Sequence, residues 1–328
     1  MNTNTHISDS APSHSHHSMK AIRVYQFGGT SELLLEDTPR PEAGFGEVLI
    51  KVSAAGVGPW DAWVRSGKSA LPQPLPLTPG SDLSGVIVAI GAGVTGFKIG
   101  QEVFGVTNSN FTGAYAEYAV ASAKMIALRP SRLSDIDAAC VPVVAVTAWQ
   151  ALVGEAKLTR GQTVLIHGAA GNVGAYAVQL ARRMGLRVFV TTGTKDINFV
   201  KSLGADRVID YLSEKFEDVT GTVDAVIDLV GGDTQTRSFA VLKAGGRLIS
   251  AVSQPDQDKA AALGIDAHFF LVDVTTERLT TIANIIETGE LVIQVGTVLP
   301  LAAARSAHEM LEGTRPHPRG KIVLRIGA

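Results

Sequence analysis

Hydrophobic residues in the first part of the chain fall in short segments that are typical of β-strands. The segments 47–57 (EVLIKVSAAGV) and 83–94 (LSGVIVAIGAGV) are strand-like runs, the second of them ended by glycines, and the segment 113–121 (GAYAEYAVA) alternates in a strand-like way. Clusters of proline and glycine, such as LPQPLPLTPG at 71–80, separate them. The pattern therefore predicts a β-rich domain over about residues 21–118.

After about residue 141 the pattern changes, and strand-like and helix-like segments alternate. A short apolar strand is predicted at 163–168 (TVLIHG), and apolar residues then recur at helical spacing over 172–185 (NVGAYAVQLARRMG). Further strands are predicted at 187–192, 207–210, 223–232, 246–252 and 268–274, and further helices at 197–205 and 233–246. Strand–helix alternation of this kind predicts an α/β fold with a doubly wound parallel sheet.

The last forty or so residues are strand-like again, with segments 291–301 and 321–326 around one helical segment at 302–313. The simplest organisation is a cofactor domain inserted into a discontinuous β-rich domain, and the cleft between the two is the expected active site. The boundaries that we predict are 1–18 for a disordered extension, 19–140 with 290–328 for the β-rich domain, and 141–289 for the nucleotide-binding domain.

Composition limits the classes of function. The 328 residues include 29 Lys and Arg against 31 Asp and Glu, and this near balance argues against non-specific binding to nucleic acid or to anionic membranes. No segment is apolar enough to predict a membrane-spanning helix. The single cysteine, Cys140, excludes an internal disulfide and a zinc cluster of several thiolates, which fits a cytoplasmic setting. The N-terminal extension holds four of the eight histidines, and a metal-binding role for it is the less favoured interpretation.

The segment HGAAGNVG at 167–174 places Gly168, Gly171 and Gly174 three residues apart, between a predicted strand and a predicted helix. Glycines at such a turn let the backbone approach a pyrophosphate, which the N–H groups and the dipole of the helix N-terminus then bind. The spacing differs from the usual GxGxxG, so a simple packing turn is the alternative. The strand–helix units that follow favour dinucleotide binding.

The end of the second predicted strand of this domain indicates which dinucleotide is bound. NAD-selective folds place a carboxylate there, on the ribose 2′-hydroxyl. This sequence reads TTGTK at 191–195, and the hydroxyls and the ammonium suit a 2′-phosphate. The segment favours NADPH over NADH, while Asp196, directly after Lys195, counts against that choice.

In combination, these segments resemble one known family. The motifs TVLIHGAAGNVGAYAVQLAR, LGADRVIDY, VDAVIDLVGG, GGRLISAV and HEMLEGTRPHPRGKIVL are similar to the medium-chain dehydrogenase/reductase superfamily, in its zinc-free quinone oxidoreductase (zeta-crystallin-like) branch. The resemblance covers Met19 to Ile326. It implies a GroES-like catalytic domain plus a Rossmann domain, a homodimer, and reduction of quinones or α,β-unsaturated carbonyls with NADPH.

The resemblance also implies roles for individual residues. Contacts to the cofactor phosphates and the adenosine are implied for Ala170, Gly171, Asn172, Val173, Gly193, Lys195 and Tyr211. Positions near the nicotinamide and its ribose are implied for Leu229, Val230, Phe270, Val272, Thr147 and Lys321, of which Lys321 would close over the cofactor. For Phe270, Val272 and Thr147, packing in the core is the alternative.

The same resemblance locates the loops in which zinc-dependent relatives bind their metal. Here these loops read GVGPWD at 56–61 and PGSDLSG at 79–85, with Gly58 and Asp82 where such relatives have ligands. Catalytic zinc needs three side-chain ligands, and Asp82 alone does not supply them. We therefore expect no metal.

Without a Lewis acid, a quinone or an enone is the acceptor that is easiest to reduce, because its negative charge is delocalised. The expected catalytic surface is made by Gly58, which leaves room above the nicotinamide, by Trp60 as an apolar wall, and by Thr147. A core role for Trp60 is the alternative. Asp61 is expected to cap the helix that follows and to pair with Arg65.

Many relatives have Asn where this chain has Gly58 and Tyr where it has Ser69, so a carbonyl-binding polar group is missing at both positions. An NADPH-binding protein with little catalysis, acting as a structural or regulatory partner, therefore remains the alternative function.

Overall fold

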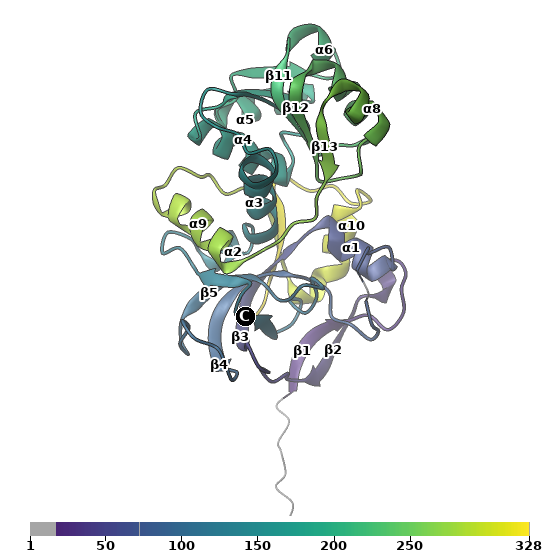
Figure 1. Cartoon of the computed structure of the whole chain (residues 1–328). Coiled ribbons are helices and arrows are strands. Elements are labelled where there is room, and N and C mark those ends of the chain that lie inside the picture. Colours follow the sequence, from purple (N-terminus) through teal and green to yellow (C-terminus); the bar gives the residue numbers. More distant parts are fainter. Residues whose placement is uncertain (1–17, 72, 328) are drawn as a thin grey trace, which may run out of the picture.

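Two large β-sheets organise the computed structural model, which describes residues 18–71 and 73–327 (Figure 1). A mixed seven-stranded sheet has the order β14-β15-β3-β4-β5-β7, with β6 also paired to β3. Its strands are β3 (Glu47–Val57), β4 (Asp82–Ile90), β5 (Glu102–Val106), β6 (Tyr118–Ser122), β7 (Ile126–Leu128), β14 (Val295–Pro300) and β15 (Lys321–Arg325). A separate antiparallel ribbon is formed by β1 (Ser18–Arg23) and β2 (Leu34–Pro39).

The seven-stranded sheet is completed by the last part of the chain. β15 pairs antiparallel with β3, so that Ile322 lies opposite Val57, and it pairs parallel with β14. Because β3 is buried along most of its length, it needs a partner on each side. The predicted return of the chain to a β-rich domain therefore corresponds to strands of the same sheet.

The second sheet has six parallel strands in the order β10-β9-β8-β11-β12-β13. They are β8 (Thr163–Ile166), β9 (Arg187–Thr192), β10 (Arg207–Asp210), β11 (Val223–Asp228), β12 (Leu242–Ser250) and β13 (Asp266–Phe269). This is the Rossmann order 3-2-1-4-5-6, in which the winding reverses between β8 and β11. The predicted fold class is confirmed.

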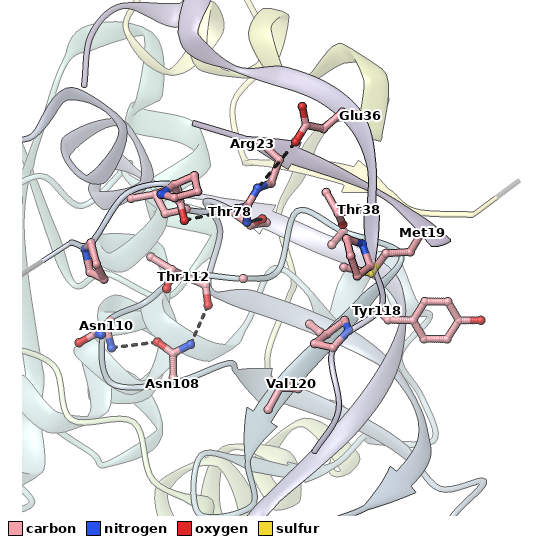
Figure 2. A pocket seen from close by; sticks show the side chains of 18 of the residues that line it. Met19, Arg23, Glu36, Thr38, Thr78, Asn108, Asn110, Thr112, Tyr118 and Val120 are labelled. Carbon is pink, nitrogen blue, oxygen red and sulfur yellow. Dashed lines mark hydrogen bonds and ion pairs between the residues drawn. The ribbon is translucent and has the colours of Figure 1, made fainter. Parts of the chain in front are cut away.

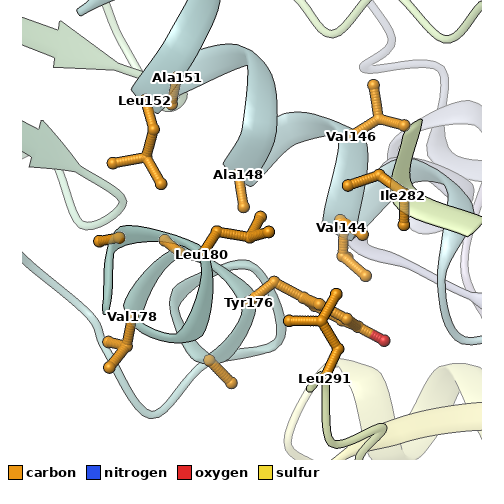
Figure 3. Close-up of a cluster of buried hydrophobic side chains, with 14 of the residues drawn as sticks. Val144, Val146, Ala148, Ala151, Leu152, Tyr176, Val178, Leu180, Ile282 and Leu291 are labelled. Atoms are coloured by element: carbon orange, nitrogen blue, oxygen red, sulfur yellow. The ribbon is translucent and has the colours of Figure 1, made fainter. Parts of the chain in front are cut away.

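Helices cover both sheets (Figure 1). They are α1 (Pro59–Ser66), α2 (Asp135–Ala138), α3 (Pro142–Trp149), α4 (Asn172–Arg183), α5 (Ile197–Ser202), α6 (Phe216–Val219), α7 (Gly232–Ser238), α8 (Gln257–Leu263), α9 (Thr276–Glu287) and α10 (Ala304–Leu311). The sequence of α3, PVVAVTAW, is apolar on all sides, which is typical of a fully buried helix. Figure 3 shows Val144 and Ala148 of α3 close to Tyr176 and Leu180 of α4, within one large buried cluster.

Some predicted elements differ from the structure. The strand predicted at 268–274 ends at Phe269, and no helix was predicted where α9 lies. α9 begins after Thr275, whose hydroxyl accepts the N–H of Arg278, and it buries Leu279 and Ile282. The hydroxyl of its first residue, Thr276, donates to the carbonyl of Ile126 in β7 at 2.7 Å, so α9 contacts the seven-stranded sheet although it lies within the predicted cofactor domain.

The domain boundaries stay predictions. The predicted disordered extension falls on residues 1–17, which lie outside the described residues, while Ser18 is already part of β1. Among the residues that the structure describes, no helix has the length and apolar character needed to cross a membrane.

Candidate functional site

Three glycines shape the turn between β8 and α4. Gly168 has a φ of 73°, in the left-handed region that favours glycine. A Cβ on Gly174 would lie 2.3 Å from the carbonyl oxygen of Gly168, so a side chain there would push α4 away from the turn. Gly171 closes the turn by donating its N–H to that same oxygen at 3.0 Å. Local sterics and this hydrogen bond therefore determine the conformation of the turn.

The N-terminus of α4 opens at this turn without a capping side chain, because its N-cap residue is Gly171. The residues implied to contact a pyrophosphate are the last two of the turn and the first two of the helix, namely Ala170, Gly171, Asn172 and Val173. Uncapped N–H groups at the positive end of a twelve-residue helix form a binding site for an anion. The arrangement fits a dinucleotide pyrophosphate, and the individual contacts stay predictions.

The loop after β11 lies against this turn. The buried carboxylate of Asp228 accepts the N–H groups of Val230 and Gly231 at 3.0 and 2.8 Å, which bends the chain at the end of β11. As a result, Cγ2 of Val230 lies 3.2 Å from the position that a Cβ on Gly168 would have, and Leu229 lies close by. Leu229 and Val230 are thus brought to the phosphate turn at the point where the winding of the sheet reverses.

At the end of β9, Gly193 and Tyr211 are neighbours. The Tyr211 hydroxyl lies 3.3 Å from the position that a Cβ on Gly193 would have, and the Tyr211 ring is exposed. Lys195 is exposed in the turn that follows β9, and no acceptor for its ammonium is found among the described parts of the chain. The structure therefore brings together the residues that the resemblance implies for the adenosine end.

Three of the residues implied for the nicotinamide end, Phe270, Val272 and Thr147, are mostly buried. Phe270 is 8% exposed and belongs to the large cluster around α3, against which Val272 also packs. The Thr147 hydroxyl donates to the carbonyl of Val143 at 2.7 Å, within its own helix. For these residues the core alternative accounts for the contacts that are seen, and roles at the nicotinamide stay predictions.

A buried ion pair joins Asp82, in one of the loops where the resemblance implies the ligands of zinc-dependent relatives, to Lys321. Nζ of Lys321 lies 2.8 Å from Oδ2 of Asp82, and the two side chains are 2% and 0% exposed. Oδ1 of Asp82 accepts the N–H of Val143, in the first turn of α3, at 3.0 Å. Burial raises the pKa of the Asp82 carboxyl, and the nearby Lys321 ammonium opposes that rise. The side chain of Asp82 therefore joins β4, α3 and β15.

This position makes Lys321 a structural residue in the present conformation. Its ammonium is held by Asp82 and lies 4.7 Å from the centroid of the Trp60 ring, a cation–π distance. A Cβ on Gly56 would lie 2.9 Å from Cε of Lys321, so glycine at this position makes room for the pair. That Lys321 closes over the cofactor stays a prediction. No group of three or more His, Cys, Asp or Glu side chains that could hold a metal ion is found within 18–71 and 73–327.

Trp60 fills the space that Gly58 leaves. Cη2 of its indole lies 2.4 Å from the position that a Cβ on Gly58 would have, so the expected open room above this glycine is not there. The indole N–H donates to the Ser81 hydroxyl at 2.9 Å. Trp60 and Phe111 pack, partly buried, against the cluster around α3, whereas Trp63 is 54% exposed. Of the two tryptophans, Trp60 is therefore the one that lies between the two domains.

The start of α1 differs from the expectation for Asp61 and Arg65. The helix begins at Pro59, and its N-cap is Gly58 rather than Asp61. Asp61 lies in the first turn, and its carboxylate accepts the N–H of Gly58 at 2.8 Å. Arg65 does not pair with Asp61. It binds Glu312 and also lies 3.0 Å from Nδ1 of His308, so the predicted pair is wrong because α10 supplies closer partners.

Asp61 is fully buried and also accepts the Tyr115 hydroxyl at 2.9 Å. Burial raises the pKa of its carboxyl from 3.8 to about 7, against the opposing effects of the Gly58 N–H and of Lys321. Between pH 3.8 and about 7, the Asp61 carboxyl is therefore protonated in the folded state and ionised in the unfolded state. The stability that this group contributes is present at low pH and is lost as the pH rises through about 7.

We expect Asp61→Asn to remove this loss, because a neutral amide still accepts hydrogen bonds and does not ionise. Relative to the unchanged protein, the variant should gain on the order of 4 kcal/mol of unfolding free energy between about pH 4 and pH 8. Denaturant unfolding over that range measures the difference. Asp258→Asn, on the exposed side of α8, is the control. If the free energy of unfolding changed with pH in the same way for Asp61→Asn and for the unchanged protein, the expectation would be refuted.

Two cavities lie in the β-rich domain, away from the predicted site. One, of about 610 Å³, is bounded by the β1–β2 ribbon, by β6 and by the loops around Thr78 and Asn108 (Figure 2). Figure 2 shows Arg23 between Glu36 and Thr78, and Asn108 bound to Thr112. The other, also of about 610 Å³, lies between α1 and α10 beside Trp63. None of the predicted catalytic or cofactor residues lines either cavity, so we do not place the cofactor in them.

Comparison with known families gives two matches. Residues 44–131 match the family described as "Alcohol dehydrogenase GroES-like domain", and residues 203–324 match the family described as "Zinc-binding dehydrogenase". The first match covers most of the strands of the seven-stranded sheet, and the second runs from just before β10 into β15.

Individual relatives are similar over nearly the whole chain. Quinone oxidoreductase from Sus scrofa is 35% identical, covering 93% of this chain and 97% of that protein. The NADPH-dependent alkenal/one oxidoreductase from Arabidopsis thaliana, described as chloroplastic, is 32% identical and covers 93% of this chain and 79% of its own length. A solved mycobacterial structure, described as complexed with NADPH, is 32% identical, has a TM-score of 0.83 and covers 94% of this chain and 100% of that chain.

Proposed function

The chain belongs to the medium-chain dehydrogenase/reductase superfamily, and we propose that it is an NADPH-dependent, zinc-independent oxidoreductase acting on a quinone or another α,β-unsaturated carbonyl. The observation that carries this proposal is the uncapped glycine turn between β8 and α4, which lies where the winding of a Rossmann-ordered sheet reverses. Relatives described as quinone oxidoreductase and as NADPH-dependent alkenal/one oxidoreductase support it.

The chain's own residues fit the cofactor at three points. The N-terminus of α4 would bind the pyrophosphate, Tyr211 and Lys195 would bind the adenosine end, and Val230 would cover the turn from the β11 side. When bound, NADPH supplies a hydride. The protein orients the acceptor, keeps water away from it, and shields the site with the apolar surface of Trp60.

The charges beside Trp60 favour a conjugated acceptor. Asp82 and Lys321 bind each other, the Lys321 ammonium donating to the Asp82 carboxylate, so neither group is directed at a substrate carbonyl. A simple ketone needs a Lewis acid or a strong hydrogen-bond donor to stabilise the alkoxide that it forms. A quinone or an enone spreads that charge over its own conjugated system, so it needs less help from the protein.

Oxidation of NADPH in the presence of a panel of acceptors tests this function. We expect turnover with benzoquinones, naphthoquinones or short enones, little with a saturated ketone, and no loss of activity on treatment with a chelator. The control reaction is NADPH with the protein and no acceptor. Turnover with saturated ketones that a chelator abolishes would overturn the proposal.

The alternative function is an NADPH-binding protein with little catalysis. It is favoured by the two positions at which many relatives carry Asn and Tyr, because Gly58 has no side chain and Ser69 is much shorter than a tyrosine. Tight NADPH binding with no turnover on any quinone or enone would support this function over the first.

Trp60→Ala tests where the acceptor lies. Loss of an aromatic wall should raise the KM for a quinone about tenfold, the equivalent of roughly 1.4 kcal/mol, and should change the Kd of NADPH less than about twofold. Steady-state kinetics and cofactor titration measure the two values. Trp63→Ala removes the same type of side chain from the exposed face of α1 and is the matched control. A lower melting temperature with an unchanged KM would instead make Trp60 a core residue.

We also propose a homodimer, which the resemblance implies. β13 is the last strand of the parallel sheet, and within the described residues its outer edge pairs with no other strand. A second copy related by a twofold axis would cover this edge. The molar mass of the protein in light scattering tests the assembly.

A further inference from the structure

The loop between α10 and β15 reaches the cofactor domain through one arginine. Nη2 of Arg319 donates to Oδ1 of Asp196, in the turn after β9, although the two residues lie 123 positions apart. The guanidinium carbon lies 4.3 Å from the centroid of the Phe199 ring in α5. The side chains of Asp196 and Arg319 are 13% and 37% exposed. A carboxylate and an aromatic ring therefore hold this guanidinium in place beside the turn after β9, where the adenosine end of the cofactor is predicted to bind.

Asp196 is also the residue that argues most strongly against NADPH. It follows Lys195 directly, and a bare carboxylate there would repel a 2′-phosphate. The bound Arg319 cancels that charge. The other carboxylate at this edge, Asp210, is buried, and it accepts the Thr194 hydroxyl at 2.5 Å and the Leu212 N–H at 3.1 Å.

Most N–H groups of Arg319 have no hydrogen-bond acceptor within the described residues. A guanidinium carries five N–H groups, and across 18–71 and 73–327 the one acceptor that Arg319 meets is Asp196, through Nη2. Asp196 and Phe199 fix the plane of the group, so few rotamers are lost when a further acceptor binds. Arginine forms strong paired hydrogen bonds with phosphate oxygens.

We propose that Arg319 determines the preference for NADPH, by neutralising Asp196 and by donating its remaining N–H groups to the 2′-phosphate. This inference rests on the proposed binding of NADPH. It means that the 2′-phosphate is held from two separate parts of the chain, by Lys195 after β9 and by Arg319 just before β15. NADH has no 2′-phosphate, so Arg319 has nothing to bind on it.

Calorimetric titration of the full protein with NADPH and with NADH tests the inference. Arg319→Ala should raise the Kd of NADPH about ten- to a hundredfold and that of NADH less than about threefold, because a charge-assisted contact is lost on NADPH alone. Adenosine 2′,5′-bisphosphate and 5′-AMP should show the same difference as competitors. Arg315→Ala is the matched control, since Arg315 lies in the same loop and contacts Ser306 and Glu309 instead.

A second variant separates charge from structure. In the Arg319→Ala background, Asp196 is an uncompensated carboxylate, so Asp196→Asn should recover at least about threefold of the lost NADPH affinity and should leave NADH unaffected. A variant that merely disturbs the arrangement of the two domains would not be rescued in this way.

The outcomes are distinct. Equal weakening of NADPH and NADH by Arg319→Ala, or no weakening of either, overturns the role of Arg319 while the proposed NADPH binding stands. Failure of the unchanged protein to bind either dinucleotide overturns the proposed function, and this inference falls with it.

Discussion

Replacing Lys321 with methionine should lower the free energy of unfolding by about 3 to 5 kcal/mol, because it leaves a buried carboxylate without its cation. Asp82 is fully buried, and its other oxygen is already bound to the N–H of Val143. Methionine keeps the length and apolar stem of the side chain, so the loss of charge is the main change. The unpaired Asp82 can be relieved only by taking up a proton or by letting in water.

Denaturant unfolding at neutral pH measures this effect, and Lys243→Met is the matched control. Lys243 pairs with Asp224 at the same 2.8 Å, but its side chain is 46% exposed, so that replacement should cost less than about 1 kcal/mol. Adding Asp82→Asn to Lys321→Met should restore much of the loss, since the buried charge is then gone. If the two lysine replacements lowered the free energy of unfolding equally, the buried ion pair would contribute no more to stability than the exposed one.

The second large effect is expected for Gly171→Asp, which should raise the Kd of NADPH at least about a hundredfold without unfolding the protein. Gly171 is the N-cap of α4 with an extended φ of -74°, which any residue adopts. Aspartate is a favoured N-cap residue, so it should stabilise the helix. Its carboxylate would bind the N–H groups that the pyrophosphate needs and would also repel the phosphates.

Gly171→Asn separates charge from size in this experiment. Asparagine caps a helix about as well and occupies the same volume without the negative charge, so it should weaken NADPH binding far less. NADPH and NADH should be affected alike, because both carry the pyrophosphate. If both variants bound NADPH as tightly as the unchanged protein, the pyrophosphate would not lie at α4.

Local patterns predict most of the fold. Strands with alternating burial, such as β6, and the glycine turn before α4 depend on residues that are neighbours in the sequence, so their spacing carries the signal. The missed helix α9 also had such a signal. Thr275 is a good capping residue, and the segment TERLTTIANIIE places Leu279, Ile282 and Ile286 on one helical face.

The contacts that the sequence did not predict are the distant ones. Asp82 and Lys321 lie 239 positions apart, and Asp196 and Arg319 lie 123 apart, so no local spacing links them. Arg65 shows the opposite error. An i to i+4 pair with Asp61 follows from helical spacing, yet Arg65 pairs with Glu312, directly after α10, instead. Only the packed structure decides between a near partner and a distant one.

The pairing of distant segments also determines the order in which the two domains can fold during synthesis. On the ribosome, β3 and Asp82 emerge long before β15, which carries Lys321 to them. Until then the seven-stranded sheet has an open edge at β3 and an acid without its counter-ion, whereas all six strands of the parallel sheet, from Thr163 to Phe269, are already available. We expect the cofactor domain to fold first during synthesis, and the domain that begins the chain to be completed last.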